Sequence, residues 1–152
     1  MPRPLGFRNV LVRVSDNPEC ERAVDAACRL AADHGATIAL ISVIEVPPVL
    51  PLESHMTSEE AAARRLLERA AAIGDSYGVT VVPRILRART AADVIVTQAA
   101  QRRTELIVIG APRKRRRAFG PTVEHVLKKA PCRVTVIGAA AEAASIAHDA
   151  AA

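Results

Sequence analysis

The chain has 152 residues and a mass of 16.2 kDa, a size that suits one domain with a sizeable buried core. Half of its residues are hydrophobic and 24% are charged, which excludes disordered and fibrous proteins. Tyr77 and two phenylalanines are its only aromatic residues, so a nucleic-acid surface that works by base stacking is not expected. No apolar run approaches the roughly 20 residues of a membrane span and no secretory signal precedes the first strand, so we expect a cytoplasmic protein.

The net charge of +5 comes from a single segment. The run Arg113-Lys114-Arg115-Arg116-Arg117 carries five positive charges, and the remaining 16 basic residues balance the 16 acidic ones. Any anionic partner should therefore be sought at this run, which we call the basic loop (residues 113–117).

The first half of the chain alternates apolar runs with helical patterns. An apolar run leads into a turn where Asn17 suits a helix N-cap and Pro18 the first helical position. That helix is expected to stop at Gly35, and Thr57-x-x-Glu60 has the spacing of a capping box that opens the next one. In chain order, this half predicts a strand at 10–14, a helix at 18–34, a strand at 37–44, a proline-rich loop at 46–56 and a helix from 57 to about 78.

The second half continues the same alternation. Thr90 with Asp93 marks a helix start, and Gly110 ends an apolar run that the basic loop follows. Gly120-Pro121 opens a short helix. In chain order, this half predicts a strand at 79–86, a helix from 90, a strand at 106–109, a helix at 121–129, a strand at 132–137 and an alanine-rich tail at 139–152.

Five strands and four helices in strict alternation predict a doubly wound α/β domain over residues 1–138. Its five-stranded parallel sheet is expected to carry helices on both faces. In such sheets ligands bind beyond the carboxyl ends of the strands, where the winding reverses. The loops expected to border that point follow the first and fourth strands, at residues 15–17 and 110–120.

The end of the chain carries the most specific motif. Residues 120–137 read G-x-T-V-x-x-V-L-x-x-A-P-C-x-V-x-V-I. Together with the apolar run at 10–14 and the first helix, this motif resembles the universal stress protein family over nearly the whole chain. The resemblance implies an adenine-nucleotide-hydrolase-like fold, a regulatory or sensor role without catalysis, and a homodimer that pairs through the last strand. Similar domains are appended to transporters, so it leaves open whether the chain is a piece of one.

Many members of that family bind ATP through a loop patterned G-x2-G-x9-G-[ST] after the fourth strand. The resemblance places the nucleotide-binding residues of this chain at Ser15, Asp16, Val43, Gly110, Arg113, Gly120 and Thr122. Arg113 stands at the second glycine position, only six residues separate it from Gly120, and Pro121 stands at the Ser/Thr position without an amide hydrogen. We therefore expect ATP or another nucleotide to need arginine side chains, which suit phosphate oxygens, in place of the family's backbone cradle.

Several interpretations stay open from the residues alone. The basic loop binds a phosphate-bearing small molecule, stays solvated, or docks a partner protein, a transporter or an anionic membrane. In the last case the domain is an interaction module with an empty crevice. The proline-rich loop at 46–56 is either a lid over the crevice or a rigid connector, and its composition does not decide between them.

The other reactive residues give no pattern of catalysis or metal binding. The four histidines lack ligand spacing, and His125 is expected on a helix surface. Ser15 lacks the flanking glycines of a nucleophile elbow. Cys20, Cys28 and Cys132 are expected to fill the core of a protein kept in a reducing compartment. We therefore expect neither an enzyme nor a metal site.

Overall fold

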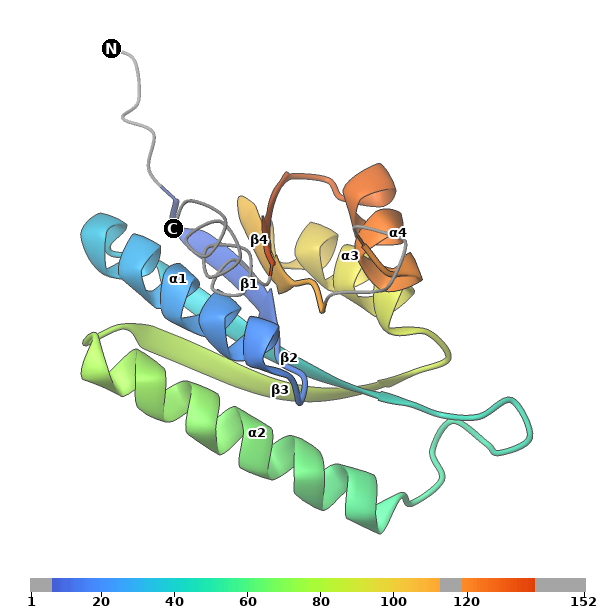
Figure 1. Cartoon of the computed structure of the whole chain (residues 1–152). Coiled ribbons are helices and arrows are strands. Elements are labelled where there is room, and N and C mark those ends of the chain that lie inside the picture. The colour runs from blue at the N-terminus through green and yellow to red at the C-terminus, as the bar shows by residue number, and fades with distance from the viewer. Residues whose placement is uncertain (1–6, 113–118, 139–152) are drawn as a thin grey trace, which may run out of the picture.

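The structure, a computed structural model, describes residues 7–112 and 119–138 (Figure 1). The basic loop and the tail at 139–152 lie outside these residues. The strands are β1 (Asn9–Arg13), β2 (Thr37–Glu45), β3 (Thr80–Ala88), β4 (Leu106–Gly110) and β5 (Arg133–Ile137). The helices are α1 (Pro18–His34), α2 (Thr57–Ser76), α3 (Ala91–Gln101) and α4 (Pro121–Lys129). Each element lies within two residues of the range that the apolar periodicity predicts.

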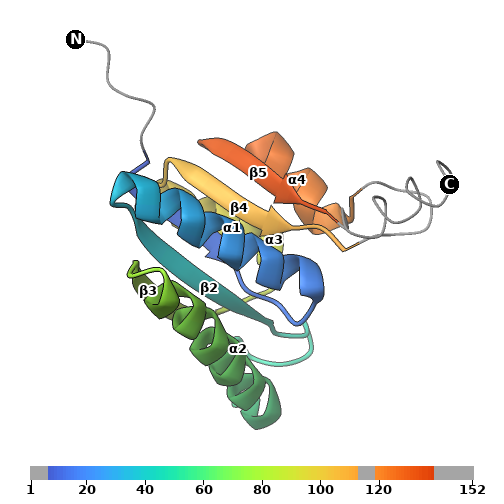
Figure 2. The same cartoon turned by 60° about the vertical axis from the view of Figure 1, so that its left-hand side comes forward.

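The five strands form one parallel sheet in the order β3-β2-β1-β4-β5. The chain winds outward from β1 to β3, then returns to the other side of β1 for β4 and β5. Figure 2 shows α1 and α2 on one face of the sheet, with α3 and α4 on the other. The predicted doubly wound fold is therefore confirmed, and its winding reverses between β1 and β4.

Both faces of the sheet are apolar because helices cover both of them. In β1 the side chains of Val10 and Val12 join the cluster under α1 and α2, whereas Leu11 joins the cluster under α3 and α4. This alternation follows from the two-residue period of a strand. The central strands are consequently uninterrupted apolar runs, which is the pattern that predicted them.

The start of α2 differs from the sequence-based expectation. Thr57 does not cap this helix, because Met56 is the N-cap and makes no side-chain hydrogen bond to the helix. The carboxylate of Glu60, the other half of the predicted capping box, pairs instead with the guanidinium of Arg87 on β3. The prediction of a capping box was wrong, because a tertiary ion pair takes the glutamate that would have closed it.

Candidate functional site

The sheet register brings several of the expected site residues to one edge. Val12 of β1 pairs with Val108 of β4, which puts Gly110 level with Val14. On the other side, Arg13 pairs with Ile41 of β2, so Ser15 lies level with Val43. The carboxyl ends of β1, β2 and β4 therefore meet at the reversal point.

The junction between β1 and α1 is held by its own polar groups. The side-chain oxygen of Asn17 accepts the amide of Cys20 at 2.8 Å, and Pro18 occupies the first helical position. Asp16 lies outside this arrangement, with 89% of its side chain exposed, and its carboxylate is 3.9 Å from the guanidinium of Arg69 on α2. Such an exposed pair is weak. The loop therefore presents Asp16 to solvent and has already satisfied the amide at the start of α1.

Gly110 ends β4 directly against the backbone of α1. A Cβ at this position would lie 2.5 Å from the amide nitrogen of Cys20 and 2.6 Å from the carbonyl oxygen of Glu19. No side chain fits there without moving the helix. The packing of the first turn of α1 thus accounts for this glycine without any ligand, a reason that the sequence alone did not reveal.

Val43 lies near the end of β2 and faces the α3 and α4 layer. It is half-buried and packs against the apolar cluster that contains Ile95 and Val126. It lies at the carboxyl end of the sheet, level with Ser15.

The start of α4 contrasts with that of α1. Gly120 is its N-cap in an extended conformation, Pro121 takes the first helical position, and no side chain caps the helix. The next residue, Thr122, is half-buried and carries both a hydroxyl and an amide. An uncapped helix start offers amides and a partial positive charge to an anion. Arg113 and the rest of the basic loop lie outside the described residues, so their predicted phosphate contacts stay predictions.

A polar contact between α3 and α4 was not evident from the sequence. The imidazole Nε2 of His125 lies 3.2 Å from a carboxylate oxygen of Asp93. The other carboxylate oxygen of Asp93 accepts the hydroxyl of Thr90 at 2.7 Å. The predicted surface position of His125 is confirmed, since 38% of its side chain is exposed. Its partner lies 32 positions earlier in the chain, and no local spacing signals such a pair.

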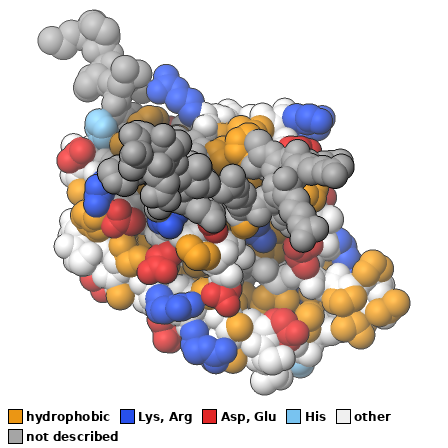
Figure 3. Space-filling model, viewed as in Figure 1, with side chains coloured by type: hydrophobic (Ala, Val, Ile, Leu, Met, Phe, Trp, Pro, Cys, Tyr) orange, Lys and Arg blue, Asp and Glu red, His pale blue; other side chains and the backbone are white. Residues whose placement is uncertain are grey.

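The proline-rich loop is held by hydrogen bonds from Arg89, the residue that follows β3. The guanidinium of Arg89 donates to the carbonyl oxygens of Val46, Pro47 and Leu50 at 3.2, 2.6 and 2.9 Å. These contacts favour the interpretation of this segment as a rigid connector. The tip nevertheless carries apolar side chains in the open, Val49 being 89% exposed, and Figure 3 shows them as a hydrophobic projection of the surface.

The three cysteines differ in exposure. Cys20 and Cys28 are buried in the core, as expected, whereas Cys132 is half-buried. Burial, with a smaller contribution from the carboxylate of Asp25, raises the pKa of Cys28 to about 11. Burial also raises the pKa of the other two thiols. All three are protonated at neutral pH, which makes them poor nucleophiles and poor metal ligands.

The described residues include neither a cluster of metal ligands nor a helix suited to a membrane. Within 7–112 and 119–138, the histidine, cysteine and acidic side chains form no group of three that could hold a metal ion. Of the helices in that part of the chain, none is both long enough and apolar enough to cross a bilayer.

A cavity near the site lies on the other face of the sheet from α4. It has a volume of about 490 Å³, lies between α1 and α2, and includes Ser15 and Asp16 in its lining. Gly110, Gly120 and Thr122 do not line it. The structure therefore divides the expected site residues between the shared sheet edge and this separate cavity.

Comparisons with known proteins gave a matching family model and several solved structures with a similar fold. The model described as the universal stress protein family matches residues 6–138. A search of curated proteins gives no match. A solved structure from Burkholderia pseudomallei, described as a protein from that family, is similar at 24% identity. Its TM-score is 0.71, and the match covers 89% of this chain and 98% of that one.

Two further solved structures contain nucleotides. The universal stress protein of Archaeoglobus fulgidus in complex with dAMP is 21% identical, with a TM-score of 0.71, and 86% of this chain and 98% of that chain are covered. A universal stress protein family protein of Arabidopsis thaliana with AMP bound is 21% identical, with a TM-score of 0.69, and 86% and 91% are covered. At these identities the likeness shows a shared fold.

Proposed function

Because the chain belongs to the universal stress protein family, we propose that it is a regulatory or sensor domain without catalytic activity. In this proposal it binds a nucleotide, or another phosphate-bearing ligand, at the carboxyl edge between β1 and β4. Ser15 and Val43 would contact the organic part of the ligand. Gly120 and Thr122 would contact its phosphate.

The observation that carries this proposal is the uncapped start of α4 at the reversal point of the sheet. Among the described residues no side-chain hydrogen bond caps this helix, and Gly120 has no Cβ to shield the amides of the first turn. A phosphate placed there gains backbone hydrogen bonds and the favourable end of the helix dipole. Similar folds that hold AMP and dAMP support a ligand with one phosphate. The arginines of the basic loop would add side-chain contacts to the same group.

The test is a titration of the full chain with AMP, ATP and inorganic phosphate, followed by calorimetry. We expect AMP to bind and the variant Gly120→Asp to bind it at least about tenfold more weakly, because a carboxylate would take the place of the phosphate at the helix start. The matched control is Thr57→Asp, which adds the same charge at the exposed start of α2. Equal affinities for the wild type and Gly120→Asp would contradict the proposed site.

Absence of catalysis is tested in the same samples. We expect no release of phosphate from ATP above the rate in buffer. Turnover that disappears in the Gly120→Asp variant would instead assign a hydrolytic function to this edge of the sheet.

We further propose that the chain forms a homodimer through β5. This strand is an edge of the sheet, and the carbonyl of its last residue, Ile137, accepts the amide of Ala111 at 2.8 Å. By alternation, the backbone groups of Val134 and Val136 point away from β4, toward the side on which a second strand would pair. Light scattering should give a dimeric mass for the wild type and a monomeric mass for Val136→Pro, which loses an outward amide. A monomeric wild type at micromolar concentration would refute the dimer.

A second candidate function is an interaction module that docks a partner protein, a transporter or an anionic membrane without a ligand. The exposed apolar tip at Val49 favours it, because large apolar side chains held rigidly in the open often mark a contact surface. Sedimentation with vesicles that contain phosphatidylserine tests whether the domain docks on an anionic membrane. Co-sedimentation that Val49→Ser abolishes, together with no response to AMP, would favour this candidate over nucleotide binding.

A further inference from the structure

We propose that the cavity between α1 and α2 binds a small zwitterion with an apolar side chain, of the chemical class of leucine and phenylalanine. This inference goes beyond the proposed nucleotide site, because the cavity uses no residue of α4 and shares only Ser15 with that site. Its walls, floor and mouth each contribute to the choice of ligand.

The floor of the cavity is apolar and already closed to solvent. Val24 of α1 and Ala70 of α2 are buried, with 1% and 3% of their surface exposed. The volume of about 490 Å³ falls within the range of about 300–1,000 Å³ that is usual for small-molecule sites. A ligand entering this space would rest on aliphatic carbon.

One wall is a stripe of α2 that remains partly exposed. Leu66 and Ile73 are seven residues apart, so they lie on the same face of the helix, and both are only half-buried. Between them lies Ala70, whose single methyl group leaves the space that a larger residue would fill. An apolar side chain placed here covers exposed carbon from both residues and removes it from water.

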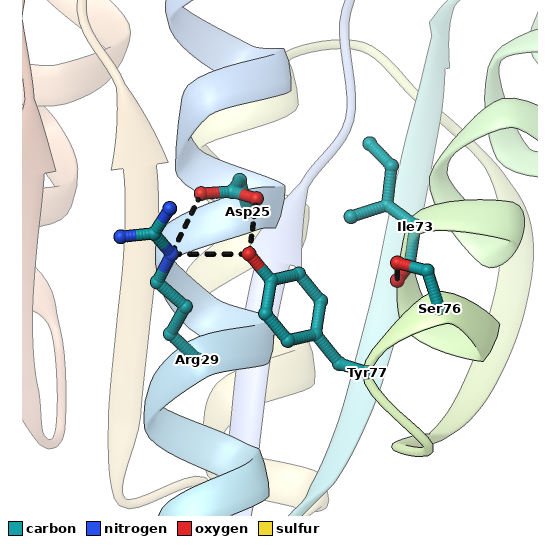
Figure 4. Close-up of polar contacts among 5 residues, drawn as sticks. All are labelled: Asp25, Arg29, Ile73, Ser76 and Tyr77. Atoms are coloured by element: carbon teal, nitrogen blue, oxygen red, sulfur yellow. Dashed lines mark hydrogen bonds and ion pairs between the residues drawn. The ribbon is translucent and has the colours of Figure 1, made fainter.

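A polar cluster near the cavity connects the two helices. In Figure 4 the hydroxyl of Tyr77, just after α2, donates to the carboxylate of Asp25 on α1 at 2.7 Å. The guanidinium of Arg29 donates to the same hydroxyl at 3.0 Å and lies 3.2 Å from Asp25. Asp25 follows Val24, which lines the cavity, so this cluster links α1 to the end of α2 close to the cavity.

The mouth of the cavity carries one charge of each sign. Asp16 and Arg69 both line it, 3.9 Å apart, with 89% and 69% of their side chains exposed. Their mutual attraction is weak, so a ligand loses little by separating them. A second carboxylate, that of Glu21, lies in the same lining.

These charges select the ligand class. A carboxylate suits the guanidinium of Arg69, and an ammonium group suits Asp16 with Glu21 beside it. A molecule with only one charge would leave one of the partners unmatched, and a molecule without an apolar side chain would leave Leu66 and Ile73 exposed. An apolar α-amino acid meets all three requirements.

The probes are L-leucine and three analogues that each lack one feature. They are 4-methylpentanoate without the ammonium group, 3-methylbutylamine without the carboxylate, and glycine without the apolar side chain. We expect leucine to produce saturable shifts in the amide NMR signals of residues 14–24 and 66–73 of the full chain. Each analogue should bind at least about tenfold more weakly.

Two substitutions test the mouth, each with a matched control. Arg69→Ala should weaken leucine binding about tenfold, whereas Arg65→Ala, which removes an exposed arginine that does not line the cavity, should not change it. Asp16→Asn should also weaken it about tenfold, with Asp33→Asn at the far end of α1 as its control. These side chains are exposed, so the variants are expected to fold normally.

Three outcomes would overturn the proposal. They are no saturable shift with leucine, an analogue that binds as tightly as leucine, and an Arg69→Ala variant with unchanged affinity. The nucleotide proposal is judged separately, because Gly120→Asp should leave leucine binding intact and Arg69→Ala should leave AMP binding intact. Loss of both ligands in either variant would also contradict two independent sites.

Discussion

Two strand-to-helix junctions lie where the winding of the sheet reverses, and the N-caps of their helices differ. At the junction of β1 and α1, the side chain of Asn17 accepts a helix amide at 2.8 Å. At the junction of β4 and α4, Gly120 holds the same position with no side-chain cap. The side chain of the N-cap residue therefore satisfies one amide at the first helix start, whereas the N-cap residue of the second has no side chain that could do so.

This difference has a structural consequence at the end of β4. Gly110, the last residue of β4, lies against the capped first turn of α1, so the capped junction also orders the end of the neighbouring strand. A helix that supplies its own cap gains stability but has less to offer an anion. Substitutions at the two junctions should therefore affect stability and binding unequally.

The largest effect on stability is expected from Gly110→Ala. The added Cβ would lie 2.5 Å from backbone atoms of α1, which cannot move as a flexible side chain could. We expect the free energy of unfolding to fall by about 3 kcal/mol, the upper part of the range for overpacking. Urea denaturation measures this, with Gly138→Ala as the control, since a Cβ there meets open space. Equal stability of the two variants would show that β4 and α1 are not in close contact.

The next effect concerns the buried thiol of Cys28 on α1, and it appears as a dependence of the free energy of unfolding on pH. The pKa of Cys28 is raised to about 11, so the folded state keeps this proton while the unfolded chain loses it above the ordinary value of 9.0. The contribution of this thiol to the free energy of unfolding is therefore fully present below pH 9. It is lost as the pH rises to 11, which lowers the free energy of unfolding by about 2–3 kcal/mol.

Cys28→Ala provides the comparison for that measurement. Unfolding curves at pH 8, 9, 10 and 11 should decline less steeply in the variant than in the wild type. Cys132→Ala, at the half-buried thiol on the α4 side, should change the slope less. The same decline in all three proteins would refute the assignment of the proton to Cys28.

A smaller effect distinguishes the two helix caps directly. Asn17→Ala removes the acceptor for the amide of Cys20 and should cost about 1 kcal/mol, as for other N-caps. The reciprocal variant, Gly120→Ser, supplies a cap to α4 and should raise stability by a few tenths of a kcal/mol while weakening AMP binding. A lower melting temperature for Asn17→Ala and a higher one for Gly120→Ser would support the difference between the two caps. A Gly120→Ser variant that is stabilised but binds AMP with unchanged affinity would contradict it.

The smallest effect is expected at the contact between α3 and α4. His125→Gln removes the exposed pair with Asp93, and exposed pairs contribute about 0–1 kcal/mol, so we expect a loss of a few tenths. A double-mutant cycle with Asp93→Asn measures the coupling. A coupling energy above about 1 kcal/mol would show that this pair, and not only apolar packing, positions α4.

Much of the fold could be predicted because its signals are local. Asn17, Pro18 and Gly35 mark the ends of α1, and the structure confirms all three, Gly35 with a φ of 64°. The strands were evident because parallel strands covered on both faces are uninterrupted apolar runs. The capping box at Thr57 failed because a local motif cannot reveal that Glu60 has a stronger partner on β3.

The candidate site was less predictable, since it depends on contacts between distant segments. The contact of Gly110 with α1 and the pair of His125 with Asp93 join residues far apart in the chain. The cavity between α1 and α2 needs Arg69 beside Asp16, which are 53 positions apart. The placement of the basic loop stays a prediction.

The sequence by itself determined the order of strands and helices, the end of the sheet where ligands should bind, and the family to which the chain is similar. These follow from periodicity, caps and a motif, all of which act over a few neighbouring residues. Only the tertiary structure decided which of these two helix starts has a side-chain cap, why Gly110 must be a glycine, and where an apolar cavity forms. Those properties depend on the distance between elements, which the packing of side chains sets.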